Sequence, residues 1–232
     1  MNNIQFPKIN KEIMLERLSH PSGTVRLLID TDAANEIDDQ YALAWALLSP
    51  EKINVEAVTA EPFSFAHHQK DLIETEMSMG LSTNESLDRK VFSSSPGWIQ
   101  DWVQRLHDKG LRANDVHFVG PSEGMELSYQ EILTIYKKLD IAHSGKVFRG
   151  SETYLNSLDK PIKTEASEVI IDLAKSGNGP LHIAALGCVT NIASALIMAP
   201  EIIKDIVVIW TSSFPSLSPH CNRPSLNLVQ DV

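Results

Sequence analysis

Residues 25–48, VRLLIDTDAANEIDDQYALAWALL, decide the fold of this chain. Residues 25–29 (VRLLI) form a short, largely apolar run bounded by polar residues, which predicts a buried strand. From Asp38 onward, leucines recur at helical spacing as far as Pro50, which predicts a helix. Residues 53–59 (INVEAVT) alternate and are β-branched, which predicts a second strand. Strand, helix and strand within about 35 residues form a βαβ unit and therefore a parallel sheet.

The C-terminal third of the sequence repeats this pattern. Residues 181–186 (LHIAAL) predict a strand, Thr190 caps a following helix, and residues 206–210 (IVVIW) predict the next strand. A further helix is predicted at about 165–175. We therefore expect an α/β protein with an open, mostly parallel sheet and helices on both faces.

Composition excludes several classes of protein. The 232 residues carry 30 acidic and 20 basic side chains, a formal net charge of −10, whereas nucleic-acid binders usually show a basic surplus. Two cysteines do not make a disulfide framework. No apolar run approaches the roughly 18 residues of a membrane span, and residues 1–19 lack the apolar core of a signal peptide. We expect a cytoplasmic protein with no nucleic-acid or membrane partner.

The middle of the chain fits the repeating pattern less well. Residues 61–127 hold polar patches and one clear helical pattern at 98–109. We expect residues 1–232 to form a single α/β domain, incomplete at its C-terminus, with 61–127 as an insertion. Because α/β proteins place their sites at the carboxyl ends of strands, this insertion is either a lid or a surface decoration.

Acidic residues cluster where the first strand meets the first helix. The five carboxylates within ten residues are Asp30, Asp32, Glu36, Asp38 and Asp39. Charges this close repel one another unless a cation or solvent screens them, and hard oxygen ligands suit Ca²⁺ or Mg²⁺. The spacing is not that of an EF-hand. The alternative is a solvated acidic loop that caps the helix N-terminus.

Two separated blocks of the sequence resemble the nucleoside hydrolases of the inosine–uridine-preferring type. The first is Asp30-Thr31-Asp32 followed by Asp38-Asp39 and an Ala/Leu-rich helix. The second is residues 181–202, an apolar strand, Gly187, a short turn and then Thr-Asn-Ile-Ala. A third, weaker match is Asn227, which stands at the place of a substrate-binding asparagine in that family. The resemblance covers about residues 24–59 and 165–232.

A rival resemblance exists for the first block alone. An apolar strand followed by Asp-x-Asp is similar to the haloacid-dehalogenase phosphatases, in which the first Asp is a nucleophile and Mg²⁺ is bound. That family has Thr or Val two positions after the second Asp, where this chain has Ala34. The later Lys and acidic pair of that family are not found in this chain.

The resemblance to nucleoside hydrolases implies a calcium-dependent hydrolysis of the N-glycosidic bond of ribonucleosides. It implies Asp32 as a calcium ligand and general base, Asp39 as a bidentate ligand, and the Leu186 carbonyl as a further ligand. Asp38 and Asn227 would bind the ribose, and Asp30 would orient the loop as a second-shell carboxylate. The chemistry is consistent with the residues, because an oxocarbenium-like sugar is stabilised by nearby carboxylates.

The sequence departs from the family pattern at three places. The loop between Asp32 and Asp38 has five residues instead of three, so Asn35 and Glu36 either face the ligand or cap the helix. The Thr-x-x-Gly-Asn that follows the second strand is replaced, and Glu61 or Ser64 is a candidate substitute for its ribose-binding Asn. The late His-Asp pair of the family is not in these 232 residues. We therefore expect a divergent branch of the family.

Hydrolysis of a small-molecule nucleoside or related N-riboside, with Ca²⁺ as cofactor, is the function that the sequence favours. The alternative is a calcium- or ribose-binding module that has lost the chemistry. We also expect a homo-oligomer.

Overall fold

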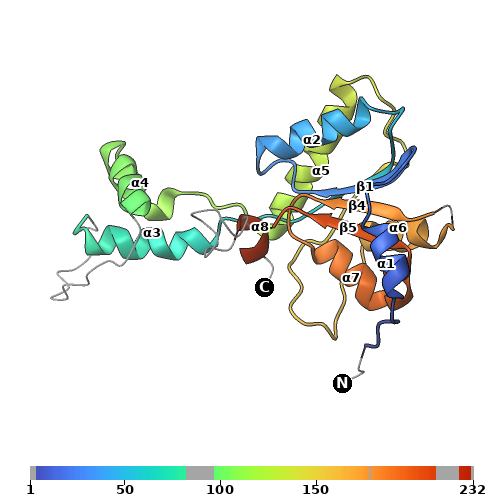
Figure 1. Cartoon of the computed structure of the whole chain (residues 1–232). Coiled ribbons are helices and arrows are strands. Elements are labelled where there is room, and N and C mark those ends of the chain that lie inside the picture. The colour runs from blue at the N-terminus through green and yellow to red at the C-terminus, as the bar shows by residue number, and fades with distance from the viewer. Residues whose placement is uncertain (1–3, 82–96, 178, 213–224, 231–232) are drawn as a thin grey trace. The chain divides into compact units, whose positions relative to one another are not determined.

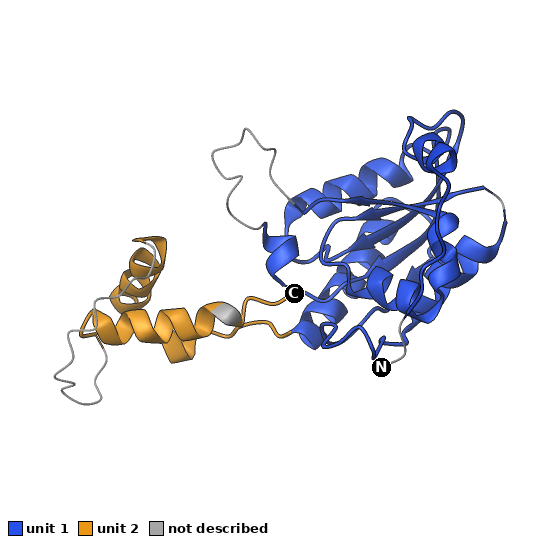
Figure 2. Cartoon of the chain, turned by 60° about the horizontal axis from the view of Figure 1, so that its bottom comes forward, with its two compact units in different colours: residues 1–63, 121–232 blue, residues 64–120 orange. Residues whose placement is uncertain are grey.

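The computed structural model describes residues 4–81, 97–177, 179–212 and 225–230. The chain divides into two compact units, one of residues 1–63 and 121–232 and the other of residues 64–120 (Figure 2). None of the helices in these described ranges is both long and apolar enough to span a bilayer.

The first unit is built around a five-stranded, fully parallel sheet. Its strands are β1 (Val25–Thr31), β2 (Ile53–Ala60), β3 (Val147–Phe148), β4 (Leu181–Ala185) and β5 (Ile206–Trp210). They lie in the order β3-β2-β1-β4-β5, so β1 is the central strand. The order reverses at β1, because the chain moves outward to β2 and β3 on one side and to β4 and β5 on the other. Such a switch point is where open parallel sheets place their ligand sites.

Helices cover both faces of this sheet (Figure 1). On one face α2 (Ile37–Leu47) and α5 (Pro121–Lys138) pack against β1 and β2 through a core that includes Ile29, Leu43 and Ile132. On the other face α6 (Glu165–Lys175) and α7 (Thr190–Met198) pack through a core that includes Leu28 and Ile183. Neighbouring residues of β1 thus point to opposite cores, as the period of a strand requires. The predicted open parallel sheet with helices on both faces is confirmed.

Three shorter elements complete the first unit. Helix α1 (Lys11–Arg17) begins at Asn10, whose side chain accepts a hydrogen bond from the backbone N–H of Glu12. The 3₁₀-helix η2 (Pro200–Lys204) leads into β5, and α8 (Leu226–Val229) is a single turn. The sequence predicts an arm that ends in a turn over residues 1–23, but not the helix α1 within it.

The second unit is helical. It consists of α3 (His67–Ser78), α4 (Gly97–Asp108) and the 3₁₀-helix η1 (Ala113–Asp115). Leu72, Ile99 and Val103 form its small core, and Trp102 and Phe118 pack against that core. The sequence predicted α4 within one residue at each end but not α3. Whether this unit acts as a lid stays a prediction.

Candidate functional site

The carboxyl ends of β1, β2 and β4 bring the predicted site residues together. Asp30 lies in register with Thr59 of β2 on one side and with Ala185 of β4 on the other. Just beyond the strands, the backbone N–H of Leu186 donates to the Asp30 carbonyl at 2.8 Å, and that of Glu61 donates to the Thr31 carbonyl at 2.9 Å. The parallel ladder thus places Leu186 and Glu61 on either side of the end of β1.

Asp32 is the first residue after β1, and a tight turn holds it in place. The backbone N–H of Asn35 donates to the Asp32 carbonyl at 2.7 Å, and the Asn35 side-chain amide donates to Asp32 Oδ2 at 2.9 Å. Only 1% of Asp32 is exposed. Burial, with a smaller contribution from the nearby charge of Glu36, raises the pKa of Asp32 to about 6. At neutral pH this carboxylate is therefore largely ionised and has enough basicity to accept a proton.

Asp39 reaches the same place from the first turn of α2. Its Oδ1 accepts a hydrogen bond from the Thr31 hydroxyl, which joins the helix to the end of β1. Burial first, and then the charge of Asp32, raise the pKa of Asp39 to about 7. Protons that these two buried carboxyl groups hold would compete with any cation that binds them.

Asp30 is fully buried and belongs to a polar network beneath Asp32. Its Oδ1 accepts hydrogen bonds from the Thr59 hydroxyl at 2.5 Å and from the Asn191 amide at 3.0 Å. Asn191 also donates to the Ala60 carbonyl at 3.1 Å and accepts from the backbone N–H of Ser151 at 2.9 Å. One side chain at the start of α7 therefore ties together β1, β2 and the segment after β3.

Glu61 is the most unusual group near this site. It is fully buried, and among the described residues neither of its carboxyl oxygens, nor Asp30 Oδ2, has a donor. Burial and the neighbouring charge of Asp30 raise the pKa of Glu61 well above its ordinary value. The protonated form of Glu61 is therefore favoured.

Gly187 makes room for these carboxyl groups. A Cβ added at this position would lie 2.4 Å from Glu61 Oε2 and 2.7 Å from Asp32 Oδ1. Those distances are far inside van der Waals contact, so only glycine fits without a shift of the acidic side chains. The glycine after β4, in the second block of the sequence, thus allows β4 to approach the acidic end of β1.

The site has a surplus of negative charge. In the described part of the chain, no ion pair involves Asp30, Asp32, Asp39 or Glu61. Buried carboxylates without a cationic side chain are neutralised by protons or by a bound cation. Burial raises the pKa values of all four groups, and no cationic side chain in an ion pair with them offsets that effect in the described residues.

The donor chemistry fits a hard divalent cation only in part. Asp32, Asp39 and the Leu186 carbonyl supply oxygen donors, the type that Ca²⁺ prefers. However, no group of three or more His, Cys, Asp or Glu side chains in the described ranges lies close enough to hold a metal ion. The described side chains thus offer a partial ligand set that main-chain carbonyl and water oxygens would have to complete.

Three predicted substrate-binding residues lie at the rim of this cluster. Glu36 and Asp38 are exposed at the start of α2, and Glu36 makes no side-chain cap to the helix. Asn227, in α8, donates its amide to the Leu186 carbonyl at 2.5 Å and to the Thr211 carbonyl at 2.7 Å. In this structure Asn227 therefore occupies the carbonyl oxygen that was predicted to bind calcium.

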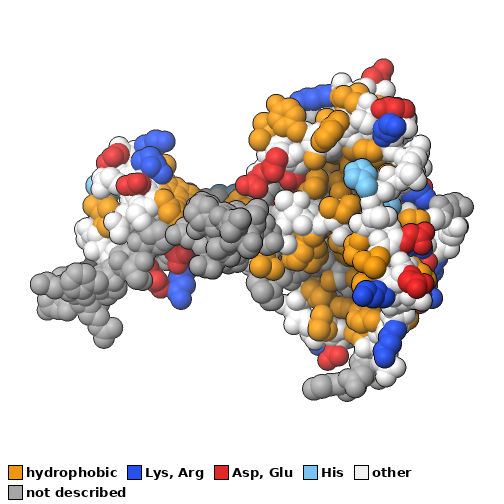
Figure 3. Space-filling view, viewed as in Figure 1, with side chains coloured by type: hydrophobic (Ala, Val, Ile, Leu, Met, Phe, Trp, Pro, Cys, Tyr) orange, Lys and Arg blue, Asp and Glu red, His pale blue; other side chains and the backbone are white. Residues whose placement is uncertain are grey.

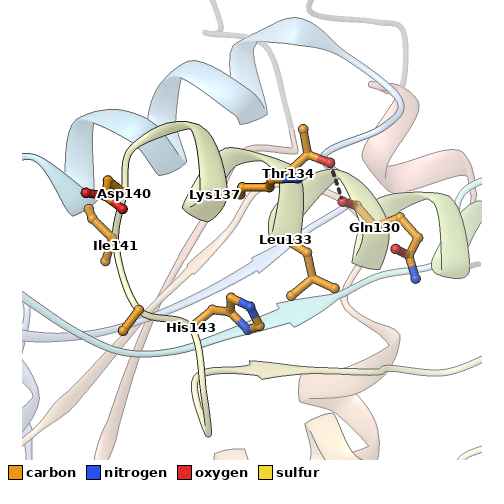
Figure 4. A pocket seen from close by; sticks show the side chains of 8 residues that line it. Gln130, Leu133, Thr134, Lys137, Asp140, Ile141 and His143 are labelled. Atoms are coloured by element: carbon orange, nitrogen blue, oxygen red, sulfur yellow. Dashed lines mark hydrogen bonds between the residues drawn. The ribbon is translucent and has the colours of Figure 1, made fainter.

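A cavity of about 560 Å³ lies elsewhere in the first unit (Figure 4). It opens beside the C-terminal end of α5, and its lining includes Gln130, Leu133, Thr134, Lys137, Asp140 and His143. The segment that follows leads directly into β3, so this cavity lies toward the amino ends of the strands. Ligand sites of open parallel sheets lie at the other edge.

Comparison with known proteins adds one structural finding. No family model and no curated protein matches the chain. Among solved structures, a purine-preferring ribonucleoside hydrolase from Gardnerella vaginalis matches 89% of this chain and 54% of its own, with a TM-score of 0.52 and 18% identity. The fold is similar to that of nucleoside hydrolases. The predicted resemblance is thereby confirmed at the level of the fold.

Other solved nucleoside hydrolases match with lower scores. An inosine–guanosine nucleoside hydrolase matches 87% of this chain and 52% of its own, with a TM-score of 0.43 and 16% identity. A plant nucleoside hydrolase matches 89% of this chain and 54% of its own, with a TM-score of 0.40 and 21% identity. The chain spans about half the length of these solved structures.

The sequence alone assigns no role to Asn191 and offers Glu61 only as one of two candidate substitutes for a ribose-binding Asn. Asn191 stood within the matched Thr-Asn-Ile-Ala block, and Glu61 was considered as a substitute for a ribose-binding Asn. A charged residue directly after a buried strand was the available signal for Glu61. Its burial against Asp30 depends on the sheet order, which brings the ends of β1 and β2 together.

Proposed function

We propose that this protein hydrolyses the N-glycosidic bond of ribonucleosides or related N-ribosides, with a divalent cation, Ca²⁺, as cofactor. The observation that supports the proposal is that Asp39, Asp32 and Gly187, the residue after Leu186, all lie at the end of β1 on the carboxyl edge of the sheet. The Leu186 N–H bonds the Asp30 carbonyl at 2.8 Å, and Asp39 accepts from Thr31 in β1. The similarity in fold to a purine-preferring ribonucleoside hydrolase supports the same reading.

In this proposal Asp32, Asp39 and the Leu186 carbonyl hold the cation. A bound divalent cation would lower the pKa of the attacking water. Asp32 would accept a proton from the attacking water, for which its pKa of about 6 is well suited. Asn35 keeps the Asp32 carboxylate oriented through its hydrogen bond to Oδ2. Asp30 lies one layer deeper and orients the end of β1 through Thr59 and Asn191.

The substrate would lie above this layer, next to the exposed start of α2. Asp38 and Asn227 would bind the ribose hydroxyls, with Asn35 and Glu36 beside them. The carboxylate-rich pocket stabilises the positive charge that the ribose develops as the base departs. The Asn227 amide nitrogen donates to the Leu186 and Thr211 carbonyls, so a ribose hydroxyl would donate to the Asn227 side-chain oxygen.

Two observations favour a second function, a non-catalytic calcium- or ribose-binding module. Asn227 is hydrogen-bonded to the Leu186 carbonyl, and the described side chains supply only part of a metal ligand set. A module of this kind would keep the acidic pocket and the ribose contacts without turnover.

The release of free ribose separates these two functions. The 232-residue chain is incubated with inosine, guanosine or uridine in the presence of calcium, and ribose and base are quantified by chromatography. Hydrolysis predicts ribose release that chelation abolishes and that Asp32→Asn reduces by about a thousandfold or more, since it removes base and ligand together. The control is Asp172→Asn, because Asp172 lies on α6, outside the acidic cluster.

Two results would speak against hydrolysis. Calcium and ribose binding without any release of base would establish the binding module instead. Turnover that is unchanged in Asp32→Asn would show that the chemistry takes place elsewhere in the chain.

A further inference from the structure

Helix α2 has an unexpected second apolar side. Its inner side packs Leu43 and Ala46 into the core. Its outer side carries Ile37, Tyr41 and Trp45, and Leu48 follows directly after the helix. These four residues, here called the outer stripe, are 64%, 70%, 77% and 62% exposed, respectively. In Figure 3, hydrophobic side chains accordingly lie on the surface over α2.

The spacing of the outer stripe makes it one continuous surface. The steps of four, four and three residues place these side chains within a narrow arc of an α-helix, one above the other. At about 1.5 Å of rise per residue, the stripe is about 16 Å long. In the described part of the chain, neither Tyr41 nor Trp45 has a side-chain hydrogen bond or a ring contact. An ordered helix thus presents two large aromatic side chains to solvent.

We propose that the outer stripe of α2 is the contact surface between two copies of this chain, packed as antiparallel helices about a two-fold axis. Contiguous apolar patches of this kind on a folded protein commonly mark interaction sites. Tyrosine and tryptophan are the residue types that contribute most to binding at the centre of such interfaces.

The exposed area is large enough for a dimer of this kind. A large aromatic side chain buries about 150–250 Å² when it is covered, so the exposed parts of the four residues amount to about 500 Å² per copy. Two copies would remove about 1,000 Å² from solvent through these side chains alone, which is the size at which specific interfaces begin. Residues at the edges of the stripe would add to that area.

The order of residues along the outer stripe suits pairing with itself. With the two-fold axis at the level of Leu43, Tyr41 of one copy faces Trp45 of the second, and Ile37 faces Leu48. Such an interface is self-complementary, because each pair of contacts occurs twice. The antiparallel arrangement also keeps apart the exposed carboxylates of Glu36 and Asp38, which a parallel pair would bring together.

Charge gives the contact a recognisable salt dependence. Each copy carries a net charge of −10, so long-range repulsion opposes association. Salt screens that repulsion and leaves the apolar contact intact. The dimer is therefore expected to tighten as salt increases, opposite to an interface that depends on ion pairs.

Sedimentation of the full chain tests the proposal. Sedimentation equilibrium at several concentrations is measured at low and at moderate salt for the wild-type chain, whose monomer mass is 25.7 kDa. The expected result is a dimer that Tyr41→Ser combined with Trp45→Ser weakens by about a hundredfold or more, as loss of two central aromatic contacts predicts. The matched control is Leu158→Ser, because Leu158 is 69% exposed and lies outside the stripe.

A cross-linking experiment tests the antiparallel register. In a Cys221→Ser background, a chain with Tyr41→Cys is mixed with a chain with Trp45→Cys and oxidised. The mixture is expected to form a disulfide-linked dimer faster than either chain alone, since residue 41 faces residue 45 across the axis.

Three results would overturn the proposal. One is a wild-type chain that stays monomeric at all concentrations and salt levels. That result would also be found if another part of the same chain covered the outer stripe. The second is a dimer that the double substitution leaves unchanged, because a different surface then holds it. The third is a dimer in which equal residues, rather than 41 and 45, cross-link fastest. None of these readouts depends on hydrolysis.

Discussion

At the scale of single residues, the site is defined by carboxyl groups that burial keeps basic. The pKa of Asp32 is raised to about 6 and that of Asp39 to about 7, in both cases mainly by burial. Glu61 is also fully buried and its pKa is raised well above its ordinary value, and Gly187 leaves the space that these groups need. Neighbouring residues thus have different roles: Asp38 is one position from Asp39, but it faces solvent.

This difference between Asp38 and Asp39 gives a prediction for calcium binding. Asp39→Asn removes a buried carboxylate and is expected to lower calcium affinity by about a hundredfold or more. Asp38→Asn is expected to leave calcium affinity nearly unchanged and to weaken the binding of inosine. Isothermal titration calorimetry of both variants measures the two affinities, and circular dichroism checks that each variant is folded.

Equal loss of calcium binding in the two variants would contradict this division of roles. A folded wild-type chain that binds no calcium would contradict the metal assignment itself.

At the scale of elements, one side chain holds three strand ends together. Asn191, at the start of α7, bonds Asp30 of β1, the Ala60 carbonyl of β2 and the Ser151 N–H after β3. Gly150 lies against the same amide, since a Cβ there would be 2.5 Å from Asn191 Nδ2. Helix α7 therefore does more than cover the sheet, because its first turn sets the spacing of the strands at the site.

Removal of the Asn191 amide should be costly for stability. Asn191→Ala removes one of the two donors to Asp30 Oδ1 and takes this partner from the Ala60 carbonyl and the Ser151 N–H, and it is expected to lower the free energy of unfolding by about 2–4 kcal/mol. Urea denaturation measures the loss. Asn54→Ala, at an exposed position whose amide bonds only Glu56, is the control and should change stability by less than about 0.5 kcal/mol. Similar small changes in both variants would show that the network does not hold the strand ends.

At the scale of the whole molecule, the buried carboxyl groups determine how stability depends on pH. Their ordinary pKa of 3.8 applies in the unfolded chain, whereas folding raises the pKa of Asp32 to about 6 and that of Asp39 to about 7. Between about pH 4 and 7 the folded chain therefore binds more protons than the unfolded chain. The contribution of these groups to stability is present at low pH and is lost as the pH rises through their folded pKa values.

The expected outcome is a melting temperature that falls between pH 5 and pH 8 in the presence of a chelator. Calcium should reverse the trend at pH 8, because it binds the ionised carboxylates of the folded chain. Thermal unfolding followed by circular dichroism at several pH values measures both effects. In the matched variant Asp39→Asn, the melting temperature should fall less steeply with pH than in the wild type. Other groups that titrate, such as His182, are present in both proteins and do not account for the difference. A variant and a wild type with the same pH dependence would contradict the assignment.

The sequence by itself determined the class of fold and the place of the acidic cluster. Alternating and apolar runs predicted β1, β2, β4 and β5, and the leucine spacing predicted α2, because the periods of strands and helices are local properties. The strand-to-helix junction also placed Asp32 and Asp39 at the carboxyl end of β1, since a parallel sheet follows from a βαβ unit. Helices α1 and α3 were missed because their apolar patterns are weak: α1 has no buried residue, and the sequence of α3 is polar.

Only the tertiary structure decided which distant residues meet at the site. Glu61 and Asn191 become neighbours of Asp30, and Gly187 becomes a neighbour of Asp32, because β2 and β4 flank β1. The order of strands in a sheet cannot be inferred from the local sequence pattern of any one segment. The pKa values of Asp32 and Asp39 likewise depend on burial, which arises from packing. The two sides of α2 also show that a local sequence pattern does not determine which apolar residues are buried. The sequence marks Tyr41, Leu43 and Trp45 alike as apolar, and the sheet decided that Leu43 is buried while the other two face solvent.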